Sequence, residues 1–542
     1  MITVISFLFF YLIIYFVGRG TVSIFKLNNE SIYGIPLNIY YPIIGLFYLG
    51  NLSLVLNFFT KITYQITIIS LIIPLLLNFL NLNKLKIILN LKNLSLYIGT
   101  PLVLGISSAN INLAYDAGLY HLNHQNWLRN EKIVFGLSNN HMRFGYSSII
   151  EYVNVNFWLN ENFLLLHFTN LIFMVVFFQV VYIFLFTDFF KFSLSVLIYG
   201  FLDNFGFNGG KNGFIEVEAI AKQDTPFAII FILSTYLLFQ LYKEDNRSNT
   251  KTINTVIFMF CLFSVQLRIL GFINLIFFLI ILIIKSGLIK SSKIIFRQNF
   301  TLSILGVLFV LKNLITSSCL FYPVKITCFD SFTWTAGNYS SPGAESDLLA
   351  NFHIALRFSN LDSWFSQWMS KDINNTVFKN LIGTLIVIII FNFMIKFINK
   401  EKLNNKNIFY ISYTIFSLII WLFTAPSIRM GVGIFLTVVL VISLIFESKE
   451  NTFIKKNIFI FSLAYFVVLG LVPQTNNYFS LINNLTSRDF IKIETPIINY
   501  VDNEFGYGVL PEKGDQCWIN IECVRNNVVT KDKYFSYVIF KR

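Results

Sequence analysis

The chain has 542 residues, of which 55% are hydrophobic, 18% aromatic and only 13% charged. Soluble domains carry about a quarter of charged residues, so this composition excludes a soluble globule. Disordered, collagen-like and disulfide-scaffold chains are excluded by the same values. The net charge is +13, but the cations lie in short clusters between apolar runs, as in loops that face anionic lipid. We therefore expect a polytopic membrane protein that does not bind nucleic acid.

Apolar runs that reach, or nearly reach, the length needed to cross a bilayer predict an all-α fold of about fourteen transmembrane helices. Two of them, 192–206 and 252–267, are short and also fit half-helices or a re-entrant pair. The first run lacks a charged start and a small-residue cleavage site, so we expect a retained span instead of a signal peptide. In chain order the runs are 2–18, 36–59, 62–82, 94–109, 163–187, 192–206, 225–242, 252–267, 269–286, 299–316, 377–398, 407–424, 430–447 and 457–472.

Lysine and arginine gather in alternate loops between these runs. The positive-inside rule assigns these loops to the cytoplasm and both termini to the outside. The expected organisation is a transmembrane domain over 1–472 and an extracytoplasmic tail over 473–542. Extracytoplasmic loops are expected at 110–160, 203–224 and 317–375. For a bacterial chain, the expected location is the inner (plasma) membrane, with the active site on its extracytoplasmic side.

Cysteine placement agrees with this topology. Cys319 and Cys328 share one expected outside loop, Cys517 and Cys523 share the tail, and Cys261 lies inside an apolar run. An oxidising compartment permits disulfides, so we expect two local bridges. Four reduced cysteines without a role are the alternative, because spacing alone does not establish pairing.

The first long outside loop holds the candidate chemistry. Asp116 follows an apolar run, Tyr120 lies four residues later, and His121 and His124 are neighbours on a helix. A carboxylate at the membrane boundary beside tyrosine and histidine suits a general base. With His121 and His124 it also offers three potential ligands for a divalent metal, and the sequence establishes no other cofactor. The ordinary alternative is a helix cap followed by an amphipathic surface helix.

Two further positions suggest a site for an anion. His141 and Arg143 lie in a segment rich in Gly, Asn and Ser, and arginine clamps phosphate with two hydrogen bonds. Arg429 lies in a tight turn between apolar runs, where a lone arginine is costly unless it is paired. The alternatives are a loop with solvated cations and an arginine that snorkels to the interface.

Signatures of soluble enzymes are absent from the sequence. It contains no Walker-type loop, no Gly-x-Ser-x-Gly and no His-Glu-x-x-His. A nucleotide-hydrolysing pump is therefore disfavoured. No Asp-x-Asp pair marks a nucleotide-sugar–metal site either.

The loop residues resemble the GT-C class of polytopic glycosyltransferases. Members of that class place an acidic residue in the first long extracytoplasmic loop, just after a span, where it deprotonates the acceptor. Their usual donor is a sugar on a polyprenyl phosphate, held by basic residues near the membrane. Asp116 occupies the matching position, and Tyr120 and His121 resemble the residues that often follow that acid.

The chain also resembles a bacterial family of polytopic membrane proteins of uncharacterised function. The similar segments keep their order along the chain, although Cys319 stands where tyrosine is usual and Ser427-Ile428 replace an Asp-Pro pair. They are Tyr115-Asp116, Gly118 to His121, Gly136 to Arg143, Ser317 to Pro323, Ala425-Pro426 with Arg429, and Gly514 to Trp518 with Cys523.

These resemblances imply an enzyme that transfers a sugar from a lipid-phosphate donor to an extracytoplasmic acceptor in surface polysaccharide or glycolipid synthesis. Asp116 would be the catalytic base. His141, Arg143 and Arg429 would hold the phosphate, and Tyr120, His121 and His124 would orient the acceptor. A lipid-linked glycan polymerase or ligase and a non-enzymatic transporter or flippase remain as alternatives. The expected partners are the lipid-linked donor and membrane lipid.

Overall fold

A computed structural model of the chain describes most of its helical parts and much of its tail. The described residues are 2–27, 30–79, 91–109, 111, 113–146, 148–205, 224–244, 250–335, short pieces between 365 and 386, 405–424, 428–445, 457–471, 492–504, 507–525 and 530–541. Helices dominate this part of the chain, and its three two-stranded antiparallel sheets are small additions. Most of the expected loops 203–224 and 317–375, most of the run 377–398 and residues 473–491 of the tail lie outside the described residues.

Six of the described helical segments are long and apolar enough to cross a membrane, so the chain is a helical protein of the membrane type. They contain the six helices α1 (Ile2–Ile24), α2 (Tyr41–Asn57), α9 (Leu164–Leu185), α11 (Asp224–Lys243), α13 (Phe272–Ser286) and α15 (Phe300–Ser317). Short 3₁₀ turns, η1 (Leu37–Tyr40) and η8 (Ile269–Gly271), extend α2 and α13 at their starts.

Six further described helices contain shorter apolar stretches of 10–17 residues. They fall on six of the remaining predicted runs. Their described apolar stretches are shorter than the stretch of about 20 helical residues that crosses a bilayer core of about 30 Å. They are α3 (Tyr64–Phe79), α10 (Phe190–Phe205), α12 (Thr250–Leu267), α19 (Asn405–Thr424), α20 (Ile428–Ile445) and α22 (Ile458–Leu471).

The predicted run 94–109 forms a helical rod that changes its winding several times. It comprises α4 (Leu91–Leu94), the π-helix η3 (Ser95–Gly99), α5 (Thr100–Gly105) and the 3₁₀ turn η4 (Ile106–Ala109). Pro101 stands at the start of α5. Proline lacks the N–H that would continue the hydrogen-bond ladder, and it stands here where the winding changes from π to α.

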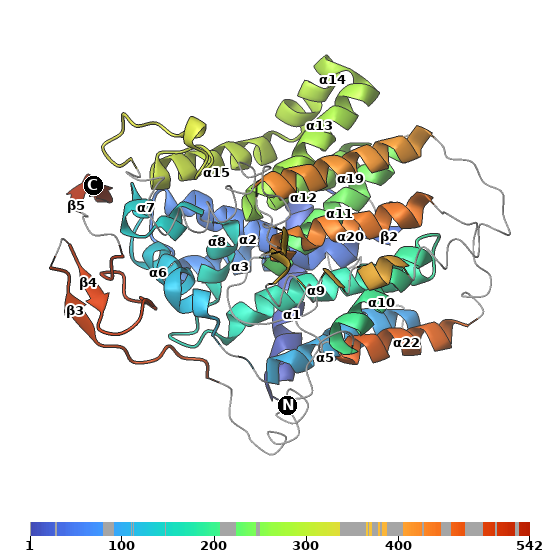
Figure 1. Cartoon of the computed structure of the whole chain (residues 1–542), viewed down its shortest axis with the longest axis horizontal. Helices are drawn as coiled ribbons and strands as arrows, with labels where there is room; N and C mark the ends of the chain where they lie inside the picture. Colours follow the sequence, from blue (N-terminus) through green and yellow to red (C-terminus); the bar gives the residue numbers. More distant parts are fainter. Residues whose placement is uncertain are drawn as a thin grey trace.

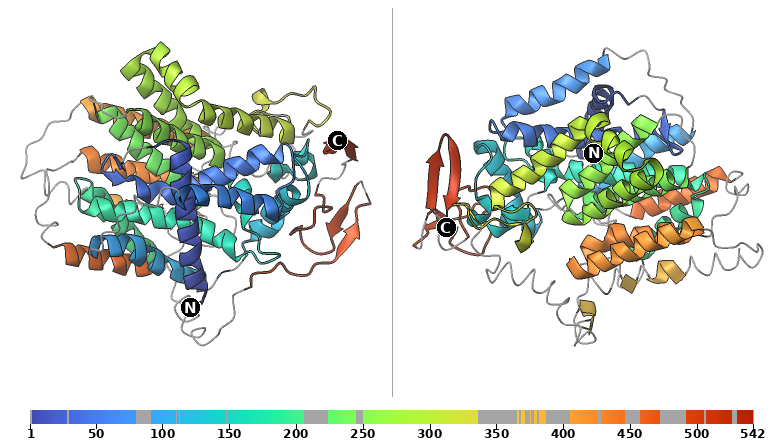
Figure 2. Two further views of the ribbon diagram at one scale, coloured as in Figure 1. Left: turned by 180° about the vertical axis from the view of Figure 1, so that it is seen from behind. Right: turned by 90° about the horizontal axis from the view of Figure 1, so that it is seen from above.

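Helix α9 is the centre of the bundle, since all of its apolar stretch is buried. Helices α2, α5, α10 and α11 pack against it. Figures 1 and 2 show α9, α11, α12, α19 and α20 running in a similar direction, while α1 crosses them and packs on α2 and α3. Gly18 allows the crossing of α1 and α2, because a Cβ atom there would overlap the backbone of Tyr41.

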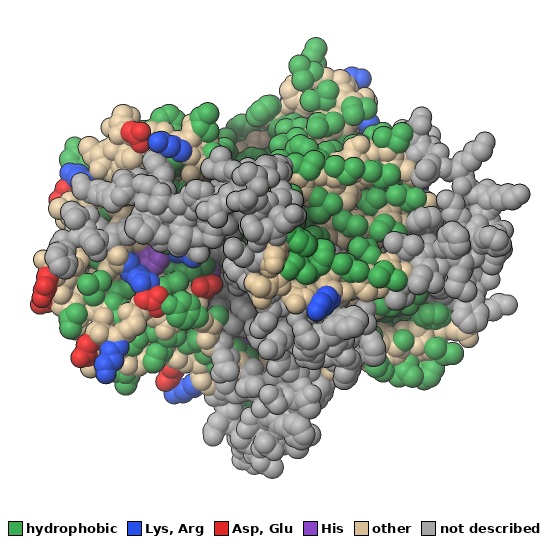
Figure 3. Space-filling view, viewed as in Figure 1, with side chains coloured by type: hydrophobic (Ala, Val, Ile, Leu, Met, Phe, Trp, Pro, Cys, Tyr) green, Lys and Arg blue, Asp and Glu red, His purple; other side chains and the backbone are tan. Residues whose placement is uncertain are grey.

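Apolar side chains remain exposed on the outside of this bundle, as a lipid-facing surface requires. Phe9 on α1, Ile69 on α3 and Val307 on α15 are among the exposed large hydrophobic residues. Figure 3 shows hydrophobic side chains covering the helical part, whereas charged side chains and histidine gather at the opposite end of the molecule.

That opposite end is a layer of short elements, here called the head layer, built from residues 113–163, 318–335 and 492–541. Its first segment contains the π-helix η5 (Ala117–His121), α6 (Leu122–Asn130), α7 (Leu137–Asn140), the 3₁₀ turn η6 (Met142–Tyr146) and α8 (Ile149–Asn154). Its last segment contains the hairpins β3 (Tyr500–Asp502) with β4 (Val509–Pro511) and β5 (Thr530–Tyr534) with β6 (Tyr537–Lys541).

The tail is part of the head layer instead of a separate unit. Phe135 exchanges backbone hydrogen bonds with β6, at 3.0 Å to the Val538 carbonyl and 2.9 Å from the Phe540 amide. A second apolar core joins the two segments, with Trp127 and Phe144 packed in one cluster with Val538 and Phe540. Residues 400 positions apart therefore fold together at one end of the bundle (Figure 1).

Both expected cysteine pairs are confirmed. Cys319 is bonded to Cys328, and Cys517 is bonded to Cys523. Cys261 is free and buried in α12. Both bridges lie in the head layer, so the two segments that the sequence assigns to the outside share one end of the molecule.

Candidate functional site

Asp116 stands at the start of η5, where the sequence predicts a helix cap. It occupies the N-cap position, but its side chain makes no capping hydrogen bond, and it is only half-buried. An aspartate that capped the helix would accept a hydrogen bond from a backbone N–H one turn on. The Asp116 carboxylate therefore does not act as a helix cap, which was the structural alternative to a catalytic role.

Several charged side chains of the candidate site interact electrostatically with the Tyr120 phenol. Burial raises the pKa of its phenol, and the Asp116 carboxylate raises it further, while Arg143 and Arg268 act in the opposite direction. The Arg143 guanidinium carbon lies 5.8 Å from the centre of the Tyr120 ring. Two carboxylates, Asp116 and Glu151, and two guanidinium groups thus act electrostatically on a single neutral phenol.

Arg268 is the residue of this group that the sequence did not single out. It caps η8 between α12 and α13, and one of its terminal nitrogens pairs with the Asp224 carboxylate at the start of α11. Only the packing of α12 brings it near Tyr120, almost 150 residues earlier in the chain. A single arginine in a short loop carries no local signal for that contact.

His141 lies beside Arg143 and is nearly fully buried. Its Nδ1 accepts a hydrogen bond from the Arg143 backbone N–H at 3.1 Å, and its Nε2 has no hydrogen-bond partner among the described residues. Burial, reinforced by Arg525 and Arg143, lowers the pKa of His141 to about 3. The imidazole is therefore neutral at physiological pH and keeps one nitrogen for a further partner.

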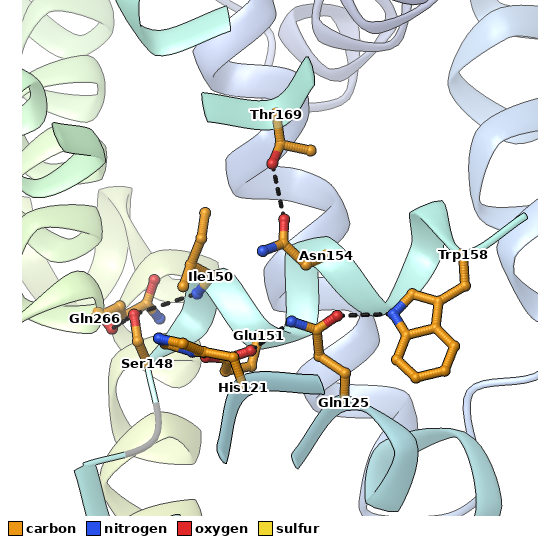
Figure 4. Close-up of polar contacts among 9 residues, drawn as sticks. All are labelled: His121, Gln125, Ser148, Ile150, Glu151, Asn154, Trp158, Thr169 and Gln266. Carbon is orange, nitrogen blue, oxygen red and sulfur yellow. Dashed lines mark hydrogen bonds and ion pairs between the residues drawn. The ribbon is translucent and has the colours of Figure 1, made fainter. Parts of the chain in front are cut away.

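His121 is buried inside the head layer, where it bonds to a carboxylate. Its Nδ1 bonds to one oxygen of the Glu151 carboxylate, and Gln125 Nε2 donates to the other oxygen at 2.7 Å. Trp158 Nε1 in turn donates to Gln125 at 2.7 Å. Figure 4 shows this row of side chains between η5, α6 and α8, with Ser148 and Gln266 beside it.

Glu151 is a functional candidate that the sequence analysis missed. It is about 1% exposed, and burial alone would raise the pKa of its carboxyl. The charge and hydrogen bond of His121, with smaller contributions from His124 and Gln125, outweigh burial and lower that pKa. Glu151 is therefore a buried carboxylate that fixes the helix carrying Asp116 and Tyr120. Its spacing of 30 residues from His121 gives no sequence pattern.

His124 also interacts electrostatically with this carboxylate. Its ring stacks on Phe144 at 5.3 Å between centres. Burial lowers the pKa of His124 to about 4, against the attraction of Glu151 and with the repulsion of Lys312. Lys312 itself lies fully buried in α15 and interacts electrostatically with Glu151.

The described residues do not form the metal site considered from the sequence. Within the described ranges, no three His, Cys, Asp or Glu side chains come together as a metal-binding group. His121 is committed to Glu151 and His124 to a stacked ring. Arg429 lies in the first turn of α20, and its side chain falls outside what the structure describes.

The disulfide loop of the tail covers the segment that begins at Asp116. The Trp518 N–H donates to the Gly118 carbonyl at 2.8 Å, and a Cβ atom at Gly118 would lie 2.7 Å from the Trp518 ring. Asn126 donates to the Ile519 carbonyl at 2.6 Å, and Asn123 bonds to the Asn520 carbonyl. Glycine at 118 is therefore required for the tail to approach this closely.

Residues 1–436 match a protein family described as a domain of unknown function, DUF8201. The chain belongs to this family. The matched region holds Asp116, Tyr120, His141 and Arg143 together with Glu151 and Arg268, whereas the Cys517–Cys523 loop lies beyond it. No curated protein and no solved structure is significantly similar to the chain. The DUF8201 match thus defines the family without defining a reaction.

His124 and His141, the two neutral histidines of the head layer, predict a loss of stability of this DUF8201 protein in acid. In an unfolded chain both imidazoles titrate near pH 6.5, whereas the folded pKa values are about 4 for His124 and about 3 for His141. Below pH 6.5 the unfolded state binds more protons, so folding stability is complete above that pH and falls as the pH decreases toward 4. At pH 5 each histidine should cost about 2 kcal/mol.

The measurement is the midpoint temperature of unfolding in detergent at pH 5 and pH 7.5. The wild-type midpoint should fall clearly in acid, and the H124Q/H141Q variant should show a smaller fall. Equal midpoints at the two pH values for the wild-type protein would contradict burial of neutral imidazoles.

Proposed function

We propose that this protein is a membrane glycosyltransferase that moves a sugar from a polyprenyl phosphate to an acceptor hydroxyl. The observation that carries the proposal is the arrangement around Tyr120. Asp116 is a carboxylate without a capping bond, and it acts on the same phenol as Arg143 and Arg268. A base next to two phosphate-binding groups at the end of a membrane bundle matches the needs of a lipid-phosphate sugar donor.

The proposed reaction is a single displacement with inversion. Asp116 removes the proton from the acceptor hydroxyl, whose oxygen forms a bond to the anomeric carbon of the donor. The bond between that carbon and the phosphate oxygen breaks, and its electron pair leaves with the polyprenyl phosphate. Arg143 and Arg268 stabilise the negative charge that develops there, and the free Nε2 of neutral His141 supplies a hydrogen bond. The phosphate needs little protonation to leave, so one carboxylate suffices.

The membrane arrangement belongs to the same proposal. We infer a GT-C-like protein of about fourteen spans in the bacterial plasma membrane, with both termini and the head layer on the extracytoplasmic side. Two disulfides in the head layer support this side, because structural disulfides persist in oxidising compartments. The lysine-rich segments near 285–297 lie at the other end of α15 from the head layer, as the positive-inside rule requires.

The decisive experiment offers three classes of substrate to the purified protein in liposomes. We expect release of polyprenyl phosphate and glycosylated acceptor from a polyprenyl-phosphate monosaccharide. Consumption of a lipid-linked oligosaccharide alone would identify a polymerase or ligase. Movement of labelled lipid-linked sugar across the bilayer without a transfer product would identify a transporter. Either of the last two results would overturn the proposed donor and reaction.

A further inference from the structure

Helix α14 (Leu288–Lys293) projects from one side of the bundle, away from the head layer (Figure 1). It continues into the π-helix η9 (Ile294–Gln298), so residues 288–298 form one helical segment, here called the elbow helix. Gly287 separates it from α13 with a φ of 75°, a conformation that favours glycine. Figure 1 shows α14 at the top of the molecule, set at an angle to α15.

The elbow helix exposes large apolar side chains that nothing in the described structure covers. Leu288 is 70% exposed, Ile289 is 73% exposed and Phe296 is 67% exposed. Ile294 and Ile295, in contrast, pack against the core and hold the helix to the bundle. Exposed apolar groups of this size on one short helix indicate a surface that contacts another apolar phase.

Cations are interleaved with these apolar groups. Lys290, Lys293 and Arg297 are exposed on the same helix, and no described residue forms an ion pair with them. The sequence from 285 to 300 contains no aspartate or glutamate. Lys285 differs from these three, because its ammonium group bonds to the carbonyls of Leu241 and Glu244 and fixes the end of α13.

We propose that the elbow helix is a binding site for anionic phospholipid headgroups, with its apolar side chains inserted at the level of the first acyl carbons. Mixed apolar and basic side chains on a short surface helix are the composition of interfacial membrane helices. The three cations select negatively charged headgroups. A protein partner or a second copy of the chain would need acidic groups that match these cations. None of its residues takes part in the proposed reaction, so this site does not depend on that reaction.

The first test measures lipid selectivity of the full-length protein in nanodiscs that contain phosphatidylcholine with spin-labelled phosphatidylglycerol. The wild-type protein should enrich phosphatidylglycerol around itself. K290Q/K293Q/R297Q should reduce the binding constant by about fivefold for each charge removed. K492Q/K513Q/K533Q, which removes three exposed tail lysines, should keep the wild-type preference. Equal enrichment by wild type and K290Q/K293Q/R297Q would overturn the proposal.

The second test removes no charge and measures how deeply the elbow helix lies in the bilayer. A nitroxide is attached at I289C, since Cys261 is buried and the other four cysteines are bonded. The label should collide with oxygen and be shielded from a water-soluble nickel complex, whereas a label at S292C should be accessible to the nickel complex. Full access of the complex at 289 would overturn the proposal, and so would shielding from both reagents, because that result indicates a protein partner.

Discussion

Replacing Asp116 by asparagine is expected to reduce the rate of sugar transfer by about 10²- to 10⁴-fold. The amide keeps the shape of the side chain but cannot take the proton of an acceptor hydroxyl. Because Asp116 makes no capping hydrogen bond, the substitution should leave the fold and its melting temperature unchanged. The measurement is initial rate with purified protein and a polyprenyl-phosphate sugar.

The matched control for this experiment is Asp330→Asn, which removes another aspartate of the head layer at an exposed position. It should retain the wild-type rate. Donor binding should survive in the Asp116→Asn variant, because the arginines that we propose to hold the phosphate are unchanged. Full activity of Asp116→Asn would show that another group removes the proton, and loss of its fold would show that Asp116 is structural.

Replacing Glu151 by glutamine should have the largest effect on stability, a loss of about 3–5 kcal/mol. The carboxylate is buried between His121, Gln125 and the charge of Lys312. Removing the Glu151 charge leaves the buried Lys312 without that nearby negative charge. The glutamine amide also has only one oxygen to accept the hydrogen bonds that the two carboxylate oxygens accept. The measurement is unfolding in detergent, followed by heat or by denaturant.

A double-mutant cycle separates this charge effect from a packing effect. In Lys312→Met the partner cation is removed, and that change alone should also destabilise the protein. E151Q/K312M should lose less stability than the two single changes together, because neither charge is left alone. Strict additivity would contradict electrostatic coupling between α8 and α15.

Sequence patterns predicted the features that depend on residues close together in the chain. The run 163–187 became α9 over Leu164–Leu185, because a long apolar stretch without glycine or proline has few alternatives in lipid. Pairing of Cys319 with Cys328 was expected because both lie in one segment assigned to the oxidising side, nine residues apart. The sequence shows equally well that the other runs are apolar. It does not show how long a helix each run forms. Six helices reach the length of a span in the described chain, and six apolar stretches fall short.

The site was only partly visible in the sequence, for a physical reason. Asp116, Tyr120 and His121 are close in the chain, and a helical spacing brings them together. Glu151 and Arg268 reach the same region through the packing of α8 and α12, which depends on many apolar contacts and leaves no short motif. His121 illustrates the consequence. Its place beside Asp116 suggested contact with the acceptor, whereas its Nδ1 is used by the buried Glu151.

Contacts between the tail and the first part of the head layer have a consequence for biosynthesis. The hydrogen bonds to Gly118 and Phe135 come from residues after 517, which the ribosome adds only after every helix described here has been made. The nascent chain therefore inserts its bundle with the Asp116 segment uncovered. Completion of the head layer waits for the last part of the polypeptide, so we expect a product terminated before residue 517 to be embedded in the bilayer and to lack the proposed activity.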